Sequence, residues 1–151
     1  MYLCTDLNPL ATRATELTGH ANSTPLQPIL TNLTSALLPR LERAVDVLVF
    51  NPPYVETEMD EMESAQESGV IERAWAGGEG GMVVTNKVLE QAEASLMIIC
   101  RQYLAHKFLQ MLLSPRGAFY LVTIPQNKPN EIISRMQAKG LEGEVGFVSP
   151  L

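Results

Sequence analysis

Four consecutive residues, Asn51-Pro52-Pro53-Tyr54, combine groups suited to recognising a flat, polar NH2 group. The asparagine amide can donate and accept hydrogen bonds, the proline carbonyls can accept them, and the tyrosine ring can pack against a planar group. Proline has a fixed φ and no backbone N–H, so two prolines in succession end a strand and stiffen the loop after it. These residues therefore predict a rigid loop that binds an amide or amino group.

An apolar, β-branched segment, Val45–Phe50, comes directly before this loop. Its length and composition predict a buried strand. Open α/β sheets bind their ligands at the carboxyl ends of their strands, and Asn51 and Tyr54 would then lie at such an end. The loop is therefore the first candidate functional site.

Asp6 is a second candidate, because it follows a predicted strand over residues 1–5. Asn8 and Pro9 come next and are typical of a helix N-cap and a first helical position. In doubly wound nucleotide-binding folds, an acidic residue at a strand end accepts hydrogen bonds from ribose hydroxyls. An aspartate can equally serve only to cap the helix, and its position alone leaves both interpretations open.

The other elements in the first half of the chain are short. We expect a helix over residues 10–18 with Gly19 as its C-cap, and an edge strand over residues 27–31 that contains Pro28. Residues 56–67 are acidic and rich in methionine, which predicts a solvated, mobile loop. Residues 77–81 contain four glycines but follow no strand and lack the lysine of a phosphate-binding loop. They predict a flexible lead into the next helix.

The second half of the chain continues the alternation of helix and strand. Residues 83–113 lack glycine and proline, which predicts one long helix or two helices with a break. Residues 114–117 predict a turn, residues 118–124 a second buried strand, and residues 130–139 a helix closed by Gly140. Residues 144–148 begin a further strand. This order is typical of an α/β fold with a mainly parallel sheet.

Composition limits the possible classes of function. The 151 residues fit a single domain, 1–151, and carry a net charge of −6, which argues against a chain that binds nucleic acid by itself. Cys4 and Cys100 have no zinc-site or disulfide spacing. We therefore expect no metal site, and a cytoplasmic location with the nucleus as a second location. No apolar segment approaches the length of a membrane span, and the start does not resemble a signal peptide.

Five blocks of sequence carry a resemblance to a known family. The blocks are residues 4–9 (Cys-Thr-Asp-Leu-Asn-Pro), 37–41 (Leu-Leu-Pro-Arg-Leu), 45–55 (the strand with the NPPY motif), 72–78 (Glu-Arg-Ala-Trp-Ala-Gly-Gly) and 113–117 (Leu-Ser-Pro-Arg-Gly). Together they resemble the eukaryotic HemK-type methyltransferases, S-adenosylmethionine (SAM)-dependent enzymes of the release-factor glutamine N5-methyltransferase class. NPPY alone marks amino-methyltransferases in general, and the flanking blocks point to this family.

The resemblance implies roles for the residues of the loop. The Asn51 side chain and the Pro52 carbonyl would hold the substrate carboxamide and turn its nitrogen toward the methyl group of SAM. Tyr54 would pack against the flat amide and exclude water. Asn51, Pro52 and Tyr54 are thus the expected catalytic residues, and Pro53 completes the substrate-binding loop. The implied cofactor-binding residues are Asp6, which would bind the ribose of SAM, together with Leu7, Asn32, Leu33 and Asn51.

The chain also departs from the family pattern. It begins at the strand that ends at Asp6, so the family's first strand and the glycine-rich loop that cradles SAM are absent from it. Asn32 stands where the family has an acidic residue near the adenine, and residues 92–107 contain an apparent insertion. We therefore expect an incomplete Rossmann-like methyltransferase fold, N-terminally truncated or alternatively spliced, with impaired activity. SAM should bind the isolated chain weakly or not at all, and a micromolar affinity by calorimetry would overturn this.

The function implied by the resemblance is methylation of a glutamine side-chain amide in a protein such as a translation release factor. A small zinc-binding activator subunit would complete a heterodimer by covering an apolar edge built from residues 1–5 and 27–32. Two alternatives stay open. One is methylation of adenine N6 in DNA or RNA, against which the acidic charge speaks. The other is a non-catalytic fragment that binds the activator or the substrate.

Overall fold

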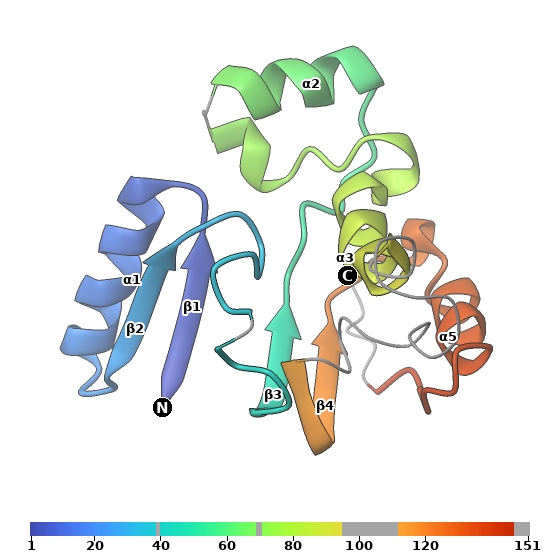
Figure 1. The fold of residues 1–151 in the computed structure, drawn as a ribbon. Coiled ribbons are helices and arrows are strands. Elements are labelled where there is room, and N and C mark those ends of the chain that lie inside the picture. Colours follow the sequence, from blue (N-terminus) through green and yellow to red (C-terminus); the bar gives the residue numbers. More distant parts are fainter. Residues whose placement is uncertain (39, 69–70, 95–111, 147–151) are drawn as a thin grey trace. The chain divides into compact units, whose positions relative to one another are not determined.

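The computed structural model describes residues 1–38, 40–68, 71–94 and 112–146 (Figure 1). These residues form two compact units, Met1–Glu42 and Arg43–Leu151, and each is described by itself. Each unit contains one pair of parallel strands. The predicted α/β architecture with parallel pairing is therefore confirmed.

The first unit is a strand–helix–strand motif (Figure 1). Strand β1 (Tyr2–Asp6) and strand β2 (Leu26–Leu30) pair in parallel, with Asp6 opposite Leu30. Helix α1 (Pro9–Ala21) connects them and packs against both strands. Parallel neighbours need a crossover of this kind, because a tight hairpin turn joins only antiparallel strands.

Helix α1 begins as expected and ends later than expected. The Asn8 side chain accepts a hydrogen bond from the Leu10 backbone N–H at 2.8 Å, and Pro9 is the first helical residue. The prediction that Gly19 caps the helix is wrong, because the helix continues to Ala21 and Gly19 is buried inside it. A Cβ atom on Gly19 would lie 2.7 Å from the Thr24 backbone oxygen, so glycine allows the close approach of helix and chain there.

The second unit is built on strand β3 (Val45–Phe50), whose predicted bounds are confirmed. It pairs in parallel with strand β4 (Leu113–Leu121). The predicted turn over residues 114–117 is wrong, because these residues form an irregularity within β4 between the pairs Val45–Leu113 and Val47–Ala118. The Ser114 hydroxyl donates to the Asp46 carboxylate at 2.9 Å, so the extra residues are fixed by a side-chain contact.

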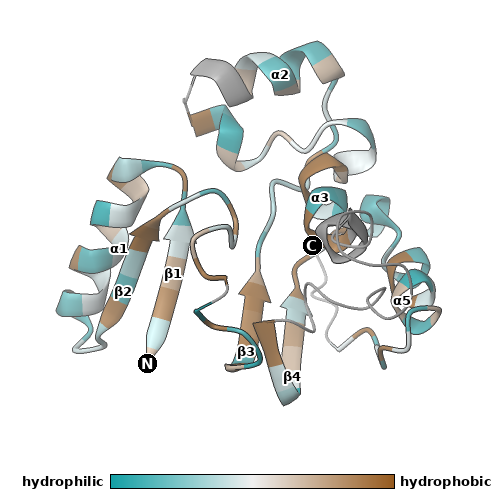
Figure 2. Cartoon of the chain, viewed as in Figure 1, coloured by the Kyte–Doolittle hydropathy of each residue, from teal (hydrophilic) through white to brown (hydrophobic). Residues whose placement is uncertain are grey.

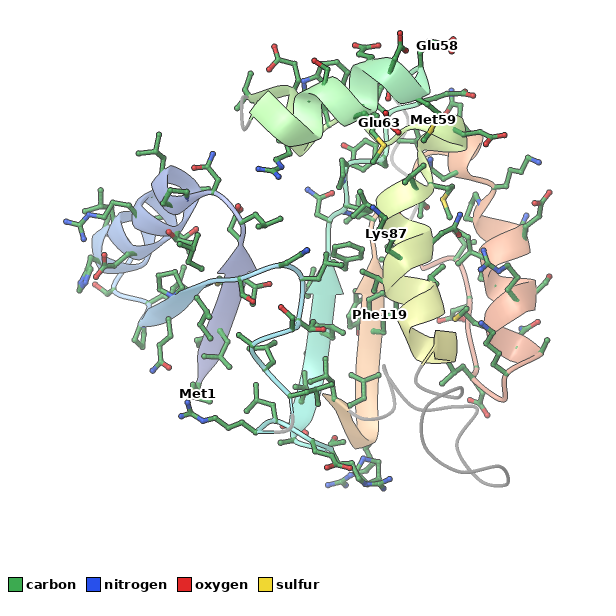
Figure 3. All side chains as sticks on the ribbon, turned by 45° about the horizontal axis from the view of Figure 1, so that its top comes forward. Met1, Glu58, Met59, Glu63, Lys87 and Phe119 are labelled. Atoms are coloured by element: carbon green, nitrogen blue, oxygen red, sulfur yellow. The ribbon has the colours of Figure 1, made fainter. Side chains whose placement is uncertain are left out.

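The core of the second unit lies between the β3–β4 pair and two helices, α3 (Val83–Ala94) and α5 (Pro129–Gln137). Phe119 projects from β4 on the side of α3 (Figure 3). The predicted closure of the last helix at Gly140 agrees with a positive φ of 79° there, two residues after the cap Ala138. The buried cluster consists of Leu89, Leu113, Ile132 and Met136.

The acidic segment folds differently from its prediction. Instead of a loop it forms helix α2 (Met59–Ser68), which is mostly hydrophilic (Figure 2). Met62 and Ala65 are only 3% and 4% exposed, so one side of the helix is buried. Asp60 and Glu61 lie in its first turn, where negative charge interacts favourably with the helix dipole. The charge that suggested a loop is compatible with an amphipathic helix.

Several predictions fall on the remaining segments. Of the helix predicted over residues 83–113, the structure describes α3, and residues 95–111 lie outside the described residues, with most of the apparent insertion and Cys100. The predicted terminal strand is not present over residues 144–146, which have no regular structure. The strand predicted over residues 118–124 corresponds to β4, which ends at Leu121 rather than at residue 124.

Candidate functional site

The NPPY loop, residues 51–54, leaves β3 at the end of its pairing with β4. The Val122 backbone N–H donates to the Phe50 carbonyl at 3.0 Å, so hydrogen bonds hold the end of β3 up to the residue before the loop. Asn51 is exposed, and its side-chain amide bonds to no other described residue. Pro52 is buried beside it. The loop therefore presents an asparagine amide that is available for a ligand, next to a fixed proline.

Tyr54 ends the loop and is half-buried. Its backbone carbonyl turns toward the protein and accepts a hydrogen bond from the Asn127 side-chain nitrogen at 3.0 Å. Gly81 approaches the same carbonyl so closely that a Cβ on Gly81 would lie 1.9 Å from the Tyr54 oxygen. The end of the loop is thus fixed by two residues far along the chain.

Asn127 joins three segments through one side chain. It lies in the short 3-10 helix η3 (Pro125–Asn127) and is 3% exposed. Its amide nitrogen donates to the Tyr54 and Gly80 carbonyls at 3.0 and 2.9 Å, and its amide oxygen accepts from the Ile124 backbone N–H at 2.9 Å. Asn127 is not among the site residues that the sequence predicts. An amide shortly after the end of a parallel strand is the signal that identified Asn51, and it also applies here.

The glycine segment, residues 77–81, packs against the continuation of the loop. Val55 pairs with Ala76: the Val55 N–H donates to the Trp75 carbonyl at 3.0 Å, and the Gly77 N–H donates to the Val55 carbonyl at 2.8 Å. The Gly78 N–H donates to the Thr57 hydroxyl at 3.0 Å. Because Gly77 is buried and both N–H groups are engaged, the prediction of a flexible lead is wrong.

Helix α2 covers the same segment with methionine side chains. A Cβ on Gly78 would lie 3.1 Å from the Met62 sulfur and 3.4 Å from the Met59 sulfur. Met59 is the first residue of α2, and it lies near the segment that leads into α3 (Figure 3). Methionine is unbranched and adaptable, and it suits an irregular glycine-rich surface of this kind. The acidic helix thereby supports the glycine segment rather than forming a separate loop.

The predicted cofactor residues Asp6, Leu7, Asn32 and Leu33 all belong to the first unit. Asp6 ends β1 opposite Leu30, so Asp6 and Asn32 come at the same end of the two strands. One Asp6 carboxylate oxygen accepts from the Asn8 backbone N–H at 2.7 Å, and the other bonds to no described residue. Leu7 and the Asn32 side chain are exposed, and Leu33 has a left-handed φ of 51°. Asp6 therefore takes part in the helix start and keeps one oxygen available.

The described residues show neither a metal-binding cluster nor a membrane-spanning helix. Among the described residues, no group of three or more His, Cys, Asp or Glu side chains is placed to hold a metal ion. None of the helices described here is both long and apolar enough to cross a membrane.

Three known proteins that are similar to this chain are named as methyltransferases. The chain is 43% identical to Methyltransferase HEMK2 of Mus musculus over 143 residues, covering 95% of this chain and 57% of that protein, and the same values hold for Methyltransferase HEMK2 of Homo sapiens. It is 40% identical to the eRF1 methyltransferase catalytic subunit mtq2 of Schizosaccharomyces pombe over 101 residues, covering 67% of this chain and 36% of that protein. No protein-family model matches the chain.

The chain thus spans a little over half the length of the two HEMK2 relatives. The similarity covers almost all of this chain, and the NPPY loop occupies the strand end where an α/β fold places its ligands. The chain belongs to the HemK-type methyltransferase family.

Proposed function

We propose that this chain supplies the acceptor-binding part of a SAM-dependent methyltransferase that modifies the side-chain amide of a glutamine in a translation release factor. The observation that carries the proposal is the NPPY loop. The exposed Asn51 amide, which bonds to no other residue that the structure describes, stands beside Pro52 at a strand end, and the Tyr54 carbonyl at the end of the loop is fixed by Asn127. The name of the fission-yeast relative, an eRF1 methyltransferase catalytic subunit, supports a release factor as the substrate.

The chemistry needs positioning more than reactive side chains. The Asn51 amide oxygen would accept a hydrogen bond from the substrate NH2, and the Pro52 carbonyl would accept the second N–H. With both N–H groups held in the amide plane, the nitrogen lone pair, which is perpendicular to that plane, would be open to a methyl donor. One of the two N–H protons would leave the nitrogen when the methyl group is added. The half-buried Tyr54 would cover the flat amide and exclude water. Orientation of this kind can supply several kcal/mol of a reaction barrier, about 7–11 in well-oriented cases.

The residues of the first unit fit the methyl donor. SAM, when bound, supplies an electrophilic methyl group on a sulfonium. The free carboxylate oxygen of Asp6 is an acceptor of the kind that ribose hydroxyls require, and the exposed Asn32 amide can donate to and accept from an adenine edge. Asp6, Leu7, Asn32 and Leu33 are the proposed SAM-binding residues of the first unit, and Asn51 is the proposed SAM-binding residue of the second unit.

We further propose a small zinc-binding activator as the partner subunit, in the cytoplasm and also in the nucleus. The relative mtq2 is named a catalytic subunit, which supports a partner. Tyr2 and Leu30, on the paired strands β1 and β2, are 61% and 59% exposed. Apolar side chains this exposed on a strand pair are suited to an edge that another protein covers.

The experiment compares methyl incorporation from labelled SAM into a release factor and into DNA, with the activator subunit present. Asn51→Ala should reduce transfer to the release factor by about 100-fold, the range for losing one positioned hydrogen-bonding group in an active site, while the protein stays folded because Asn51 is exposed. Asn130→Ala, an exposed asparagine at the start of α5, is the matched control and should keep full activity.

Three outcomes separate the alternatives. Label in the release factor at a glutamine, lost in Asn51→Ala, supports the proposal. Label in DNA adenine and not in the release factor replaces the proposed substrate with nucleic acid. A release factor that binds the chain without any methyl incorporation, measured by surface plasmon resonance beside the labelling assay, overturns the catalytic proposal in favour of a non-catalytic binding chain.

A further inference from the structure

The NPPY loop is held at both ends by one short segment, residues 122–127. At the start of the loop, the Val122 N–H donates to the Phe50 carbonyl at 3.0 Å. At its end, the Asn127 side chain donates to the Tyr54 carbonyl at 3.0 Å. Between these two contacts stand Pro52 and Pro53, whose φ angles are fixed. Few backbone torsions remain free, so the positions of the two ends determine the course of the loop.

The Asn127 side-chain amide has two N–H donors and two acceptor positions on its oxygen. Both donors and one acceptor position are engaged. Both donations go to carbonyls of separate segments, Tyr54 and Gly80, and its oxygen receives the Ile124 N–H. At 3% exposure, water cannot replace these bonds easily. A buried amide with this many partners holds the Tyr54 peptide plane in one orientation, and the direction of the Tyr54 ring and of the preceding carbonyls follows from that plane.

We propose that Asn127 is a positioning residue for the acceptor site and acts through the Tyr54 carbonyl. It does not touch the substrate; it keeps Asn51 and the Pro52 carbonyl in the geometry that holds the amide. Its effect on methyl transfer rests on the function proposed above, whereas its effect on the loop does not. The two effects can therefore be measured separately.

The decisive variant is Asn127→Asp. Aspartate keeps the size of the side chain and the acceptor for Ile124, but it loses both donations and places a carboxylate against the Tyr54 and Gly80 carbonyls. Asn130→Asp is the matched control, because Asn130 is exposed in the first turn of α5 and an acid there interacts favourably with the helix dipole. If Asn127→Asp does not fold, Asn127→Ser replaces it, since serine keeps one donor and leaves the second carbonyl unpaired.

The first readout needs no enzymatic activity. Amide hydrogen exchange should become at least about tenfold faster at Val55 and Gly77 in Asn127→Asp, because local opening governs exchange, and should be unchanged in Asn130→Asp. Trp75, the single tryptophan, accepts the Val55 N–H through its carbonyl, so quenching of its fluorescence by acrylamide should rise in parallel. Unchanged exchange at both amides in the folded variant overturns the proposal.

The second readout is methyl transfer in the complex with its partner and the release factor. Asn127→Asp should lower kcat by about 100-fold with the KM for SAM unchanged, the loss expected when reacting groups shift by about 1 Å. A residue that served folding alone would lower the melting temperature and leave kcat per folded molecule as in the wild type, and that result would contradict the proposal. If the wild-type protein transfers no methyl group, the proposed function fails, and the exchange result still decides the role of Asn127.

Discussion

Replacing Gly81 with alanine should displace the NPPY loop from its place in the second unit. Gly81 has a φ of 65°, in the left-handed region that L-amino acids avoid. The added Cβ would lie 1.9 Å from the Tyr54 carbonyl oxygen and 2.7 Å from the Asn127 side-chain nitrogen. The Tyr54 oxygen must move by more than about 1 Å to restore an ordinary van der Waals separation. That movement breaks the hydrogen bond between Tyr54 and Asn127.

Two terms contribute to the loss of stability expected for Gly81→Ala. The left-handed backbone conformation costs an alanine about 1–2 kcal/mol. Leaving the buried Asn127 donor without the Tyr54 carbonyl costs about 1–3 kcal/mol more. We therefore expect Gly81→Ala to lower the free energy of unfolding by about 2–5 kcal/mol, which is a large share of the about 5–15 kcal/mol that stabilises a typical domain.

Gly80→Ala is the control that isolates the clash. Gly80 also has a left-handed φ, 58°, but a Cβ on it would meet no heavy atom within 4 Å. It should cost only the backbone term, about 1–2 kcal/mol. Urea unfolding followed by the fluorescence of Trp75 measures both variants. Equal losses for Gly80→Ala and Gly81→Ala would refute the argument that the glycine segment positions Tyr54 by close contact.

Two predictions concern the first unit. Asn8→Ala removes the side-chain acceptor for the Leu10 N–H and should cost about 1 kcal/mol in urea unfolding, as helix N-caps generally do. An unchanged midpoint would mean that Asn8 does not stabilise the helix start. Gly19→Ala would gain about 1 kcal/mol of helix propensity, but its Cβ would lie 2.7 Å from the Thr24 carbonyl, so we expect a net loss of about 1–3 kcal/mol as in overpacked sites. The exposed Thr18→Ala in the same helix shows the effect of a gain in helix propensity without a close contact. A stabilisation of about 1 kcal/mol by Gly19→Ala, the full propensity gain, would show that the close contact has no energetic effect.

The features predicted from sequence are those with local causes. The bounds of β3 follow from a short β-branched run ended by two prolines, and the start of α1 follows from Asn8 and Pro9. Each signal lies within a few residues of the structure it determines. The placement of Asn51 at a strand end was predictable for the same reason, whereas its proposed role and those of Pro52, Tyr54 and Asp6 stay predictions.

The wrong predictions have non-local causes. The acidic segment forms a helix because Met62 and Ala65 find burial against other parts of the unit, which its charge pattern does not reveal. Gly19 continues a helix because Leu26 and Thr24 fold back onto it. Residues 114–117 look like a turn, yet the pairing of β3 with β4 keeps them within a strand. In each case a tertiary contact overrides a local preference.

Asn127 could not be connected with Tyr54 from sequence, because the contact depends on where η3 and the loop lie in the folded unit. The glycine segment was misinterpreted for a similar reason. Glycines suggest freedom when a chain is considered alone, but Gly77 and Gly81 are required here by close approach to neighbouring backbone. The partners of the loop are therefore a result of the tertiary structure and not of any short motif.

The distance along the chain between Tyr54 and Asn127 also affects how the protein folds during its synthesis. The two residues are 73 positions apart in the chain. Translation adds about 5–20 residues per second, so about 4–15 s pass between the synthesis of Tyr54 and that of Asn127. During that time the loop has its prolines but not the side chain that fixes its end. The acceptor site must therefore form late, after β4 has emerged from the ribosome and has paired with β3.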